Sequence, residues 1–468
     1  MAKPVVNYDG SITAHPQQLI QPKTVEEIQA ALRDRARYPG PVRAKGSYHS
    51  LTPCASSDGT MVDMSKMNRV VAIDRANMTF TAQAGLQFIK ASDALREQDL
   101  QFHTNIEIGN MTLGSAACCH SKDALDGVEF GQVGSYVTRI KWVTPAGDLA
   151  EASEEASPEL LRKMRTSYGL CGIVYEVTFR IKPIEAIHLT YLPRPVAELT
   201  QAEVDSLIEG SEGLVCWTVG RTSVFQRRHR INEPLIFGPL LALARKRLWN
   251  HTAAHGAYFI EKFIADRRLR KAAQENSANI ANLLYSALRL LGGITLLAPD
   301  KTIDYSRTRQ SARYAFTFWA FPRAQWLQTL REYLDFADEH FKATGFRCNM
   351  PLGSYFIRRD THSLLSYSND GDIFSIDPIH ASTDNAAWHE FLRRFNEFAY
   401  RRNGIPLLNQ SPFVERRHCE AAFGERWFEF SEWVKSVDPD GRMVNPFFGE
   451  LLSERAHRTA PAPVGVAG

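Results

Sequence analysis

Residues 42–50, VRAKGSYHS, bring together a strand-like run, a small-residue turn and a histidine three positions after Gly46. In such a turn, Gly46 and Ser47 let backbone N–H groups approach an anion closely, as a diphosphate requires. His49 would then stand beside whatever group the diphosphate carries. A turn histidine that bonds its own backbone is at least as common, so the spacing alone leaves both interpretations open.

Short strands and helices must position this turn, because the first 185 residues alternate between the two. Thr24 and Glu27 form a capping box that predicts a helix through about Arg37. Hairpins are predicted for RVVAID with MTFTAQAG, and for SYVTRIKWVTPAGDLAEA around its Pro-Ala-Gly turn. A further strand, in GIVYEVTFRIKP, is expected to stop at Pro183. Together these patterns predict a mixed α+β domain.

The character of the chain changes between about residues 184 and 402. Alternating strands such as YAFTFWAFP (314–322) accompany long amphipathic helices, and residues 403–450 return to short elements. We therefore expect a domain formed by residues 1–183 and 403–455, interrupted by an inserted domain at 184–402. The tail 456–468 is rich in Pro and small residues and is expected to be disordered.

Composition narrows the function classes. A chain of 468 residues favours two domains, and 55 Lys and Arg against 52 acids argue against nucleic acid as the main partner. Seven cysteines without a CxxC pair do not predict a disulfide framework. The first residues lack a signal-peptide pattern, and no run of about 20 apolar residues predicts a transmembrane segment. We expect a cytoplasmic protein.

Several common motifs are absent or weak. No GxGxxG follows a strand, and neither GxxxxGK[ST] nor GxSxG occurs. His251 and His255 in HTAAH share a helix face but lack a third ligand, so no metal site is predicted. The basic clusters QRRHR, ARKRLWNH and DRRLRK leave a peripheral contact with an anionic membrane open, although solvated helix faces explain them better.

Four stretches in order resemble flavoproteins of the vanillyl-alcohol-oxidase superfamily, which carry a PCMH-type FAD-binding domain. VRAKGSYHSLTPCASSDGTMVDM is similar to the family's phosphate loop, and TLGSAACCHSKDALDGVEFGQVGSYV to its second flavin loop. SYGLCGIVYEVTFRIKP and SVDPDGRMVNPFF match two later motifs. The resemblance is nearest to the alditol and aldonolactone oxidases and to decaprenylphosphoryl-ribose oxidase. It covers residues 15–183 well, 403–450 moderately and the middle weakly.

The resemblance implies a two-domain α+β fold, with an inserted substrate-binding cap domain built on an antiparallel sheet. It also implies FAD as the cofactor. In lactone and alditol oxidases the histidine at the position of His49 is bonded to the flavin 8α carbon, whereas the ribose oxidase type has tyrosine there. We therefore expect covalent FAD through His49. The implied cofactor-binding residues are Arg43, Ala44, Lys45, Gly46, Ser47, Tyr48, His49, Ser50, Thr112, Gly114, Ser115, His120, Gly172, Ile173, Val174 and Asn445.

The substrate side departs from the alditol and lactone pattern. Where that branch carries charged helpers, this chain aligns Phe318, Tyr355 and Gln410, all neutral. The aromatic residues of the middle segment then favour a larger or less polar substrate than a simple sugar lactone, unless they are core beneath a sheet. The implied catalytic candidates are Lys122, Tyr355, Gln410 and His120, with Lys122 placed to steady negative charge beside the flavin.

We therefore predict an FAD-dependent oxidoreductase that transfers a hydride to flavin N5 from an alcohol carbon of a small-molecule substrate that is moderately large, aromatic or sugar-containing. Dioxygen is favoured as the acceptor over another electron acceptor. The alternatives are a dehydrogenase, the oxidation half of an epimerisation, or a flavin-binding protein with little catalysis.

Overall fold

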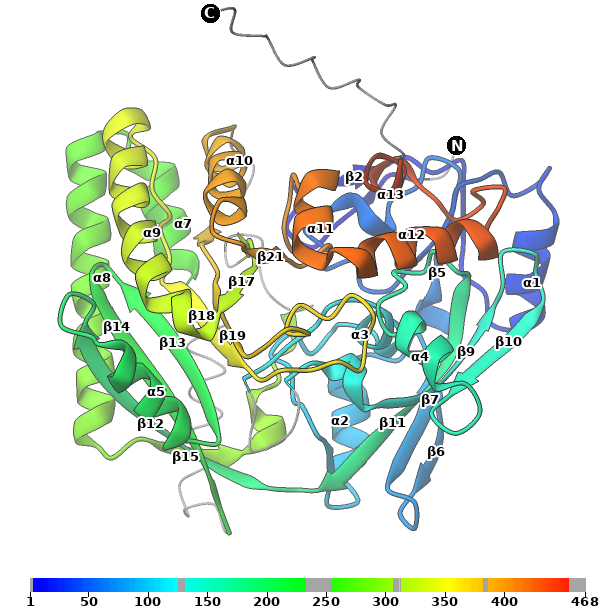
Figure 1. Ribbon diagram of the computed structural model, residues 1–468, viewed down its shortest axis with the longest axis horizontal. Coiled ribbons are helices and arrows are strands. Elements are labelled where there is room, and N and C mark those ends of the chain that lie inside the picture. Colours follow the sequence, from blue (N-terminus) through cyan, green and yellow to red (C-terminus); the bar gives the residue numbers. More distant parts are fainter. Residues whose placement is uncertain are drawn as a thin grey trace, which may run out of the picture.

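The computed structural model describes residues 3–124, 131–232, 254–305, 311, 313–381 and 386–453. The predicted disordered tail, 456–468, lies outside these ranges. Two sheet-based halves lie side by side (Figure 1). We call the half built from the first 183 residues the N-terminal domain and the half built from residues 184–402 the cap domain.

The N-terminal domain contains two main sheets. A parallel sheet has the order β3-β5-β4, with strands at Gln18–Ile20, Thr60–Asp63 and Val42–Lys45. An antiparallel sheet has the order β10-β9-β11-β7-β6, with β8 (Leu100–Phe102) paired to the end of β11. Its five strands are Leu149–Ser153, Val137–Val143, Ile173–Pro183, Thr79–Gln83 and Val70–Asp74.

Four helices and a small hairpin complete this domain. The helices are α1 (Val25–Arg33), α2 (Phe88–Arg96), α3 (Leu113–Cys118) and α4 (Pro158–Met164). The hairpin joins β1 (Val5–Val6) and β2 (Thr13–Ala14). Phe88 of α2 packs in the main hydrophobic core with Phe80 and Phe179, which lie on β7 and β11 of the antiparallel sheet.

The cap domain is built on an antiparallel sheet of order β15-β12-β14-β13-β18-β19-β17-β21. Its strands are Ile294–Leu297, Ala186–Pro195, Thr222–Ile231, Gly213–Val219, Leu352–Ile357, Ile373–Ile376, Trp319–Pro322 and Ile405–Pro406. A short pair, β16 (Tyr314–Phe316) with β20 (Ile379–Ala381), lies beside it. The helices are α5 (Gln201–Glu209), α7 (Ala254–Phe263), α8 (Arg267–Leu290), α9 (Arg323–Thr344) and α10 (Ala386–Tyr400).

After the cap, the chain returns to the N-terminal domain. Helices α11 (Arg416–Phe423), α12 (Glu425–Val437) and α13 (Pro446–Leu452) lie over that domain in Figure 1. Met443 packs in a core with Val42 and Val62, so the C-terminal segment supports β4, which leads into the Gly46 turn, and its neighbour β5. Only β21, at the start of this segment, pairs with a cap strand, β17, among the described strands.

The predicted fold class is confirmed, and most of the predicted elements form. Two details differ. The first helix ends at Arg33 rather than Arg37, because the Asp34 carboxylate accepts a hydrogen bond from the Arg37 N–H and closes a turn. YAFTFWAFP is two strands in two sheets, since the chain leaves β16 at Thr317, whose N–H bonds the Pro378 carbonyl.

Candidate functional site

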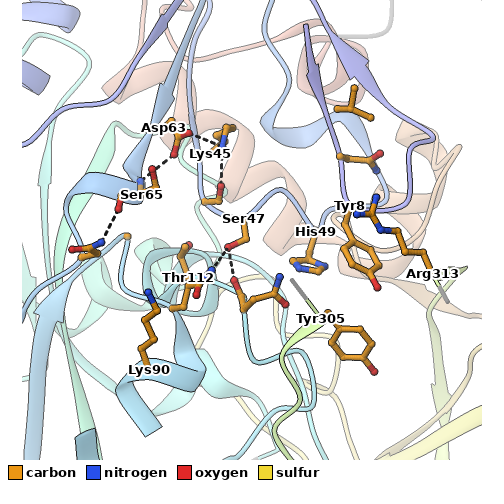
Figure 2. Close-up of a pocket in the computed structure, with 17 residues that line it drawn as sticks. Tyr8, Lys45, Ser47, His49, Asp63, Ser65, Lys90, Thr112, Tyr305 and Arg313 are labelled. Atoms are coloured by element: carbon orange, nitrogen blue, oxygen red, sulfur yellow. Dashed lines mark hydrogen bonds and ion pairs between the residues drawn. The ribbon is translucent and has the colours of Figure 1, made fainter. Parts of the chain in front are cut away.

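The Gly46 turn lines a cavity of about 520 Å³, which we call the first pocket; most of its lining comes from the N-terminal domain, and Tyr305 and Arg313 come from the cap domain. The ends of β4 and β5, the start of α2 and the loop before α3 meet here. Figure 2 shows Lys45, Asp63 and Ser65 at one end of the first pocket and His49, Tyr8, Arg313 and Tyr305 at the other. The volume is in the range of cofactor-binding cavities.

The centre of the first pocket requires glycine at position 46. A Cβ on Gly46 would lie 2.1 Å from Thr112 Oγ1 and 3.1 Å from Ser115 Oγ. The Ser47 hydroxyl donates a hydrogen bond to the Asn110 carbonyl, which ties the same two loops together. Backbone amides and small side chains therefore line a narrow part of the pocket, which suits the diphosphate of a dinucleotide. We call this part, formed by Gly46, Ser47 and Thr112, the diphosphate cradle.

Replacing Gly46 by valine is expected to yield protein that folds but is largely free of flavin. The added side chain would fill the space between the two loops, and we expect at least a tenfold loss of FAD affinity. Flavin content per polypeptide, measured by absorption after purification and after soaking in FAD, checks this. Gly371→Val is the matched control, because a Cβ there meets nothing within 4 Å. Full flavin occupancy in the Gly46 variant would contradict the diphosphate assignment.

Charge in the first pocket is partly neutralised before any ligand binds. Lys45 Nζ lies 3.0 Å from Asp63 Oδ2. Burial acts to raise the pKa of Asp63, but Lys45 and hydrogen bonds from Gln21 and Ser65 hold it below its usual value. Lys90 and Arg313, which also line this pocket, are then the cations best placed to meet an anionic ligand.

His49 is held with its imidazole at one end of the first pocket. Tyr48 adopts a φ of 59°, which turns the chain sharply, and its buried ring packs with Ala14 and Met61. The His49 ring stacks on Tyr8, with the ring centroids 4.4 Å apart. Burial lowers the pKa of His49 to about 4, although a hydrogen bond with Asn110 acts to raise it, so the imidazole is neutral at pH 7. Its buried Nε2 has no hydrogen-bond partner among the described residues.

A second, smaller cavity of about 90 Å³ lies between the two domains; we call it the second pocket. Lys122, from the loop after α3, meets Tyr355 of β18 and Gln410 of the C-terminal segment here. Hydrogen bonds from a single tyrosine connect the two pockets. The Tyr305 hydroxyl, on the first pocket, donates to Glu107 Oε1 (3.0 Å) and lies 2.9 Å from the Tyr314 hydroxyl, both on the second.

Lys122 is the cation at the centre of the second pocket. Its Nζ lies 3.9 Å from the centre of the Tyr355 ring and 4.3 Å from that of Phe318. The same nitrogen lies 3.3 Å from Asp377 Oδ2, and both side chains are buried. A buried ammonium between two aromatic faces and one carboxylate is positioned to hold further negative charge.

Two further side chains offer polar groups to the second pocket. Burial, followed by the charges of Glu107, Asp123 and Asp377, raises the pKa of Tyr355 well above its usual value, so its hydroxyl stays protonated. Gln410 is fixed by its backbone, which bonds the Leu407 carbonyl, and its buried Oε1 has no partner within the described ranges. Both groups are available to hydrogen-bond a polar ligand.

Comparison with known protein families identifies the family of this chain. Residues 16–153 match a family model described as an FAD binding domain, and residues 177–451 match the model of D-arabinono-1,4-lactone oxidase. The second match covers more than half of the chain. The chain belongs to the D-arabinono-1,4-lactone oxidase family. It is an FAD-dependent oxidoreductase, which confirms the resemblance found in the sequence.

Named relatives of this family member are lactone oxidases and dehydrogenases. L-gulonolactone oxidase from Scyliorhinus torazame is 23% identical over 94% of this chain and 96% of its own. L-gulono-1,4-lactone dehydrogenase from Mycobacterium tuberculosis is 26% identical over 44% of this chain and 47% of its own. Cholesterol oxidase from Brevibacterium sterolicum has the same fold, with a TM-score of 0.72, 14% identity and coverage of 96% and 97% of the two chains.

Five of the predicted cofactor residues line the first pocket: Lys45, Gly46, Ser47, His49 and Thr112. Ser115 lies directly behind them, with its hydroxyl 3.1 Å from that of Thr112. Gly114 supports the same loop, because its N–H bonds the Ala84 carbonyl and a Cβ would meet Ala84 at 2.9 Å. These residues form one continuous surface around the Gly46 turn.

Arg43, a predicted cofactor-binding residue, is not among the residues that line the first pocket. Its buried guanidinium donates hydrogen bonds to the carbonyls of Cys54, Tyr168, Gly169 and Met443, so it ties loops together behind the first pocket. Desolvation lowers the pKa of Arg43. Ala44 is likewise a strand residue, paired with Val62 in β5.

The remaining predicted cofactor residues also lie behind the surface of the first pocket. Tyr48 bonds Ser56 with its hydroxyl (2.5 Å), and Ser50 bonds the Thr52 and Asn409 carbonyls. Asn445 caps α13 and donates to the carbonyls of Pro53 and Ser56. Gly172 (φ 126°) approaches Val143, and Ile173 and Val174 pair with Val143 and Trp142 in the sheet.

His120 lies outside the second pocket, unlike the other catalytic candidates. Its Nε2 donates to the Leu365 carbonyl over 2.6 Å, and the Asn409 amide donates to the His120 carbonyl. Burial lowers the pKa of His120 to about 4. The side chain therefore fixes the loop that leads into Lys122 and does not reach the cavity.

Sequence reasoning missed several residues of both pockets. Tyr8, Lys90 and Arg313 line the first, and they come from segments with no motif of their own. Asp377 lines the second and directly follows strand β19 in DIFSIDP. A carboxylate at the end of a buried strand is a recognisable signal, but its meeting with Lys122 depends on the long-range packing of the cap.

Other predictions concern metals, membranes and cysteines. No group of three His, Cys, Asp or Glu in the described ranges could hold a metal; His255 lies 2.8 Å from the Ser311 hydroxyl, and His251 is outside those ranges. None of the helices in the described part of the chain has the length and hydropathy needed to cross a bilayer.

In the basic clusters, Arg228 and Arg270 form ion pairs with Asp123 and Glu261, while ARKRLWNH is not described. All seven cysteines are free.

Proposed function

We propose that this protein oxidises an aldonolactone at an alcohol carbon, with FAD as the immediate acceptor. The observation that carries the proposal is the pair of adjoining pockets. One has a diphosphate-sized cradle ending at a neutral histidine, and the other is a small polar cavity that contains a buried lysine. The two relatives named for gulonolactone support the substrate class.

The residues of the first pocket fit FAD. The amides around Gly46 and Ser47 would hold the diphosphate, with Lys90 and Arg313 as counter-charges. His49 would hold the flavin covalently, since its imidazole is neutral and its Nε2 is unbonded among the described residues. Bound FAD would supply the hydride acceptor, flavin N5.

The residues of the second pocket act on the substrate. Lys122 would stabilise negative charge that develops on the substrate oxygen as the C–H bond breaks. The Tyr355 hydroxyl would donate a hydrogen bond to a lactone oxygen, and Gln410 Oε1 would accept one from a lactone hydroxyl, which together orient the ring. The aromatic side chains of Trp217, Phe316 and Tyr355 line this pocket and would pack against the bound substrate.

The size of the second pocket favours a compact substrate. A cavity of about 90 Å³ admits a sugar lactone more readily than a large aromatic molecule. The sequence had suggested the larger molecule because aromatic residues are abundant near position 318. Phe318 and Trp319 are completely buried, however, and belong to the core beneath the sheet.

Anaerobic mixing tests this proposal directly. The flavin absorption should bleach when the protein meets L-gulono-1,4-lactone or L-galactono-1,4-lactone, and hydrogen peroxide should form when air is admitted. Bleaching without peroxide would assign a dehydrogenase that uses another acceptor. A flavin that dithionite reduces but no lactone bleaches would contradict the proposal and favour a flavin-binding protein with little catalysis.

A further inference from the structure

The second pocket requires a group that accepts the hydroxyl proton of an alcohol. When a hydride leaves the carbon, the O–H bond must also break for a carbonyl to form. The positions aligned with the charged helpers of the lactone branch are neutral here, namely Phe318, Tyr355 and Gln410. The proton acceptor must therefore come from another element.

Asp377 occupies a suitable place in the second pocket. It follows β19, and its backbone exchanges two hydrogen bonds with Gly353, at 2.8 and 3.1 Å. A Cβ on Gly353 would lie 3.6 Å from the Asp377 Cβ, so the missing side chain leaves room for this carboxylate. Lys122 holds Oδ2 at 3.3 Å, while buried Oδ1 has no hydrogen-bond partner in the described ranges.

The other carboxylates that line the second pocket are already engaged. Asp123 is paired with Arg228 (3.1 Å) and Lys301 (2.8 Å), and Glu107 accepts from Tyr305. Of these three groups, within the described residues, Asp377 alone has a buried carboxylate oxygen without a partner. Its oxygen is thus the one available to a substrate hydroxyl.

The charges around Asp377 set its protonation. Burial raises its pKa to about 6, and the charge of Lys122 and a hydrogen bond from the Ser375 side chain partly offset this rise. Glu107, Asp123, Tyr314 and Tyr355 are the other titratable groups that line the same cavity. A carboxylate in this range is ionised at neutral pH and is still a stronger base than an exposed aspartate, as a general base should be.

We infer that Asp377 is the catalytic base, and that its Oδ1 accepts the hydroxyl proton of the substrate while Lys122 holds Oδ2. In this step the substrate loses the C–H hydrogen with its two electrons to the flavin and the O–H proton to Asp377. The O–H electron pair becomes the second C–O bond, and the proton later passes to solvent. The inference rests on the proposed function, because it needs an alcohol substrate in this pocket.

Replacing Asp377 by asparagine in the flavin-loaded protein tests the role. Wild-type flavin reduction by lactone should be flat above about pH 6 and fall about tenfold per unit below it, as Asp377 becomes protonated. The Asp377→Asn variant should be slower by about 10²- to 10³-fold at neutral pH and should lose this inflection. Asp123→Asn is the matched control, since Asp123 is fully paired, and it should keep the inflection.

A measurement without turnover separates this inference from the proposed function. Difference infrared spectra of the wild type should show a protonated-carboxyl band that appears below about pH 6 and is missing in Asp377→Asn. If lactones bleach the flavin but this band is absent, or the variant keeps the inflection, the role of Asp377 is overturned while the function stands. If no lactone bleaches a reducible flavin, both fail.

Discussion

Replacing Lys122 by methionine is expected to slow flavin reduction by lactone about a thousandfold while leaving the flavin bound. The ammonium is the buried cation in contact with Asp377, and it lies between the Tyr355 and Phe318 rings. Removing it takes away the charge that stabilises developing negative charge on the substrate oxygen. Methionine keeps the length and the apolar stem, so the shape of the cavity is retained.

Stopped-flow mixing under anaerobic conditions measures the rate of flavin reduction. Lys182→Met is the matched control, because Lys182 is also a buried lysine paired with a carboxylate, Glu185, at 2.9 Å. It lies on β11, and it does not line the second pocket. A Lys122 variant that reduces its flavin as fast as this control would remove Lys122 from the reaction.

The local parts of the fold were predictable because short-range patterns determine them. The capping of α1 by Thr24 forms as predicted, and its hydroxyl accepts from the Glu27 N–H. The hairpins β6-β7 and β9-β10 follow the alternation and turn residues in the sequence. YAFTFWAFP failed as a single strand because alternation cannot show that the halves pair with different partners, β20 and β19.

The residues of the candidate site were predictable from the sequence only where they lie close together in the chain, in the Gly46 turn. Lys45, Gly46, Ser47 and His49 meet in the first pocket because they are nearly contiguous in the chain. Arg43, in the same motif, instead hydrogen-bonds the carbonyls of Gly169 and Met443, which are 126 and 400 positions away in the sequence, so no local pattern predicts where its side chain lies. Asp377 reaches Lys122 across 255 positions of sequence, so only the docking of the cap onto the N-terminal domain brings them together.

Replacing His49 by alanine is expected to convert a flavin that stays with the polypeptide in acid into one that is released completely. The wild-type imidazole suits a bond to the flavin 8α carbon, because burial keeps it neutral and Nε2 is unbonded among the described residues. The Gly46 cradle is untouched by this change, so we expect the variant still to bind FAD, without the covalent bond.

Acid precipitation followed by absorption spectra of the pellet and supernatant distinguishes the two states. His103→Ala serves as the control, because the His103 ring stacks on Tyr136 and does not line the first pocket; its flavin should remain in the pellet. Release of all flavin from the wild type would contradict the covalent bond but leave the diphosphate cradle standing. Retention of flavin in the His49 variant would instead show that another side chain makes the bond. The covalent bond is assigned to His49 because its imidazole is a neutral, buried nucleophile at the end of the diphosphate cradle. Only a His49→Ala variant that releases its flavin in acid agrees with this assignment.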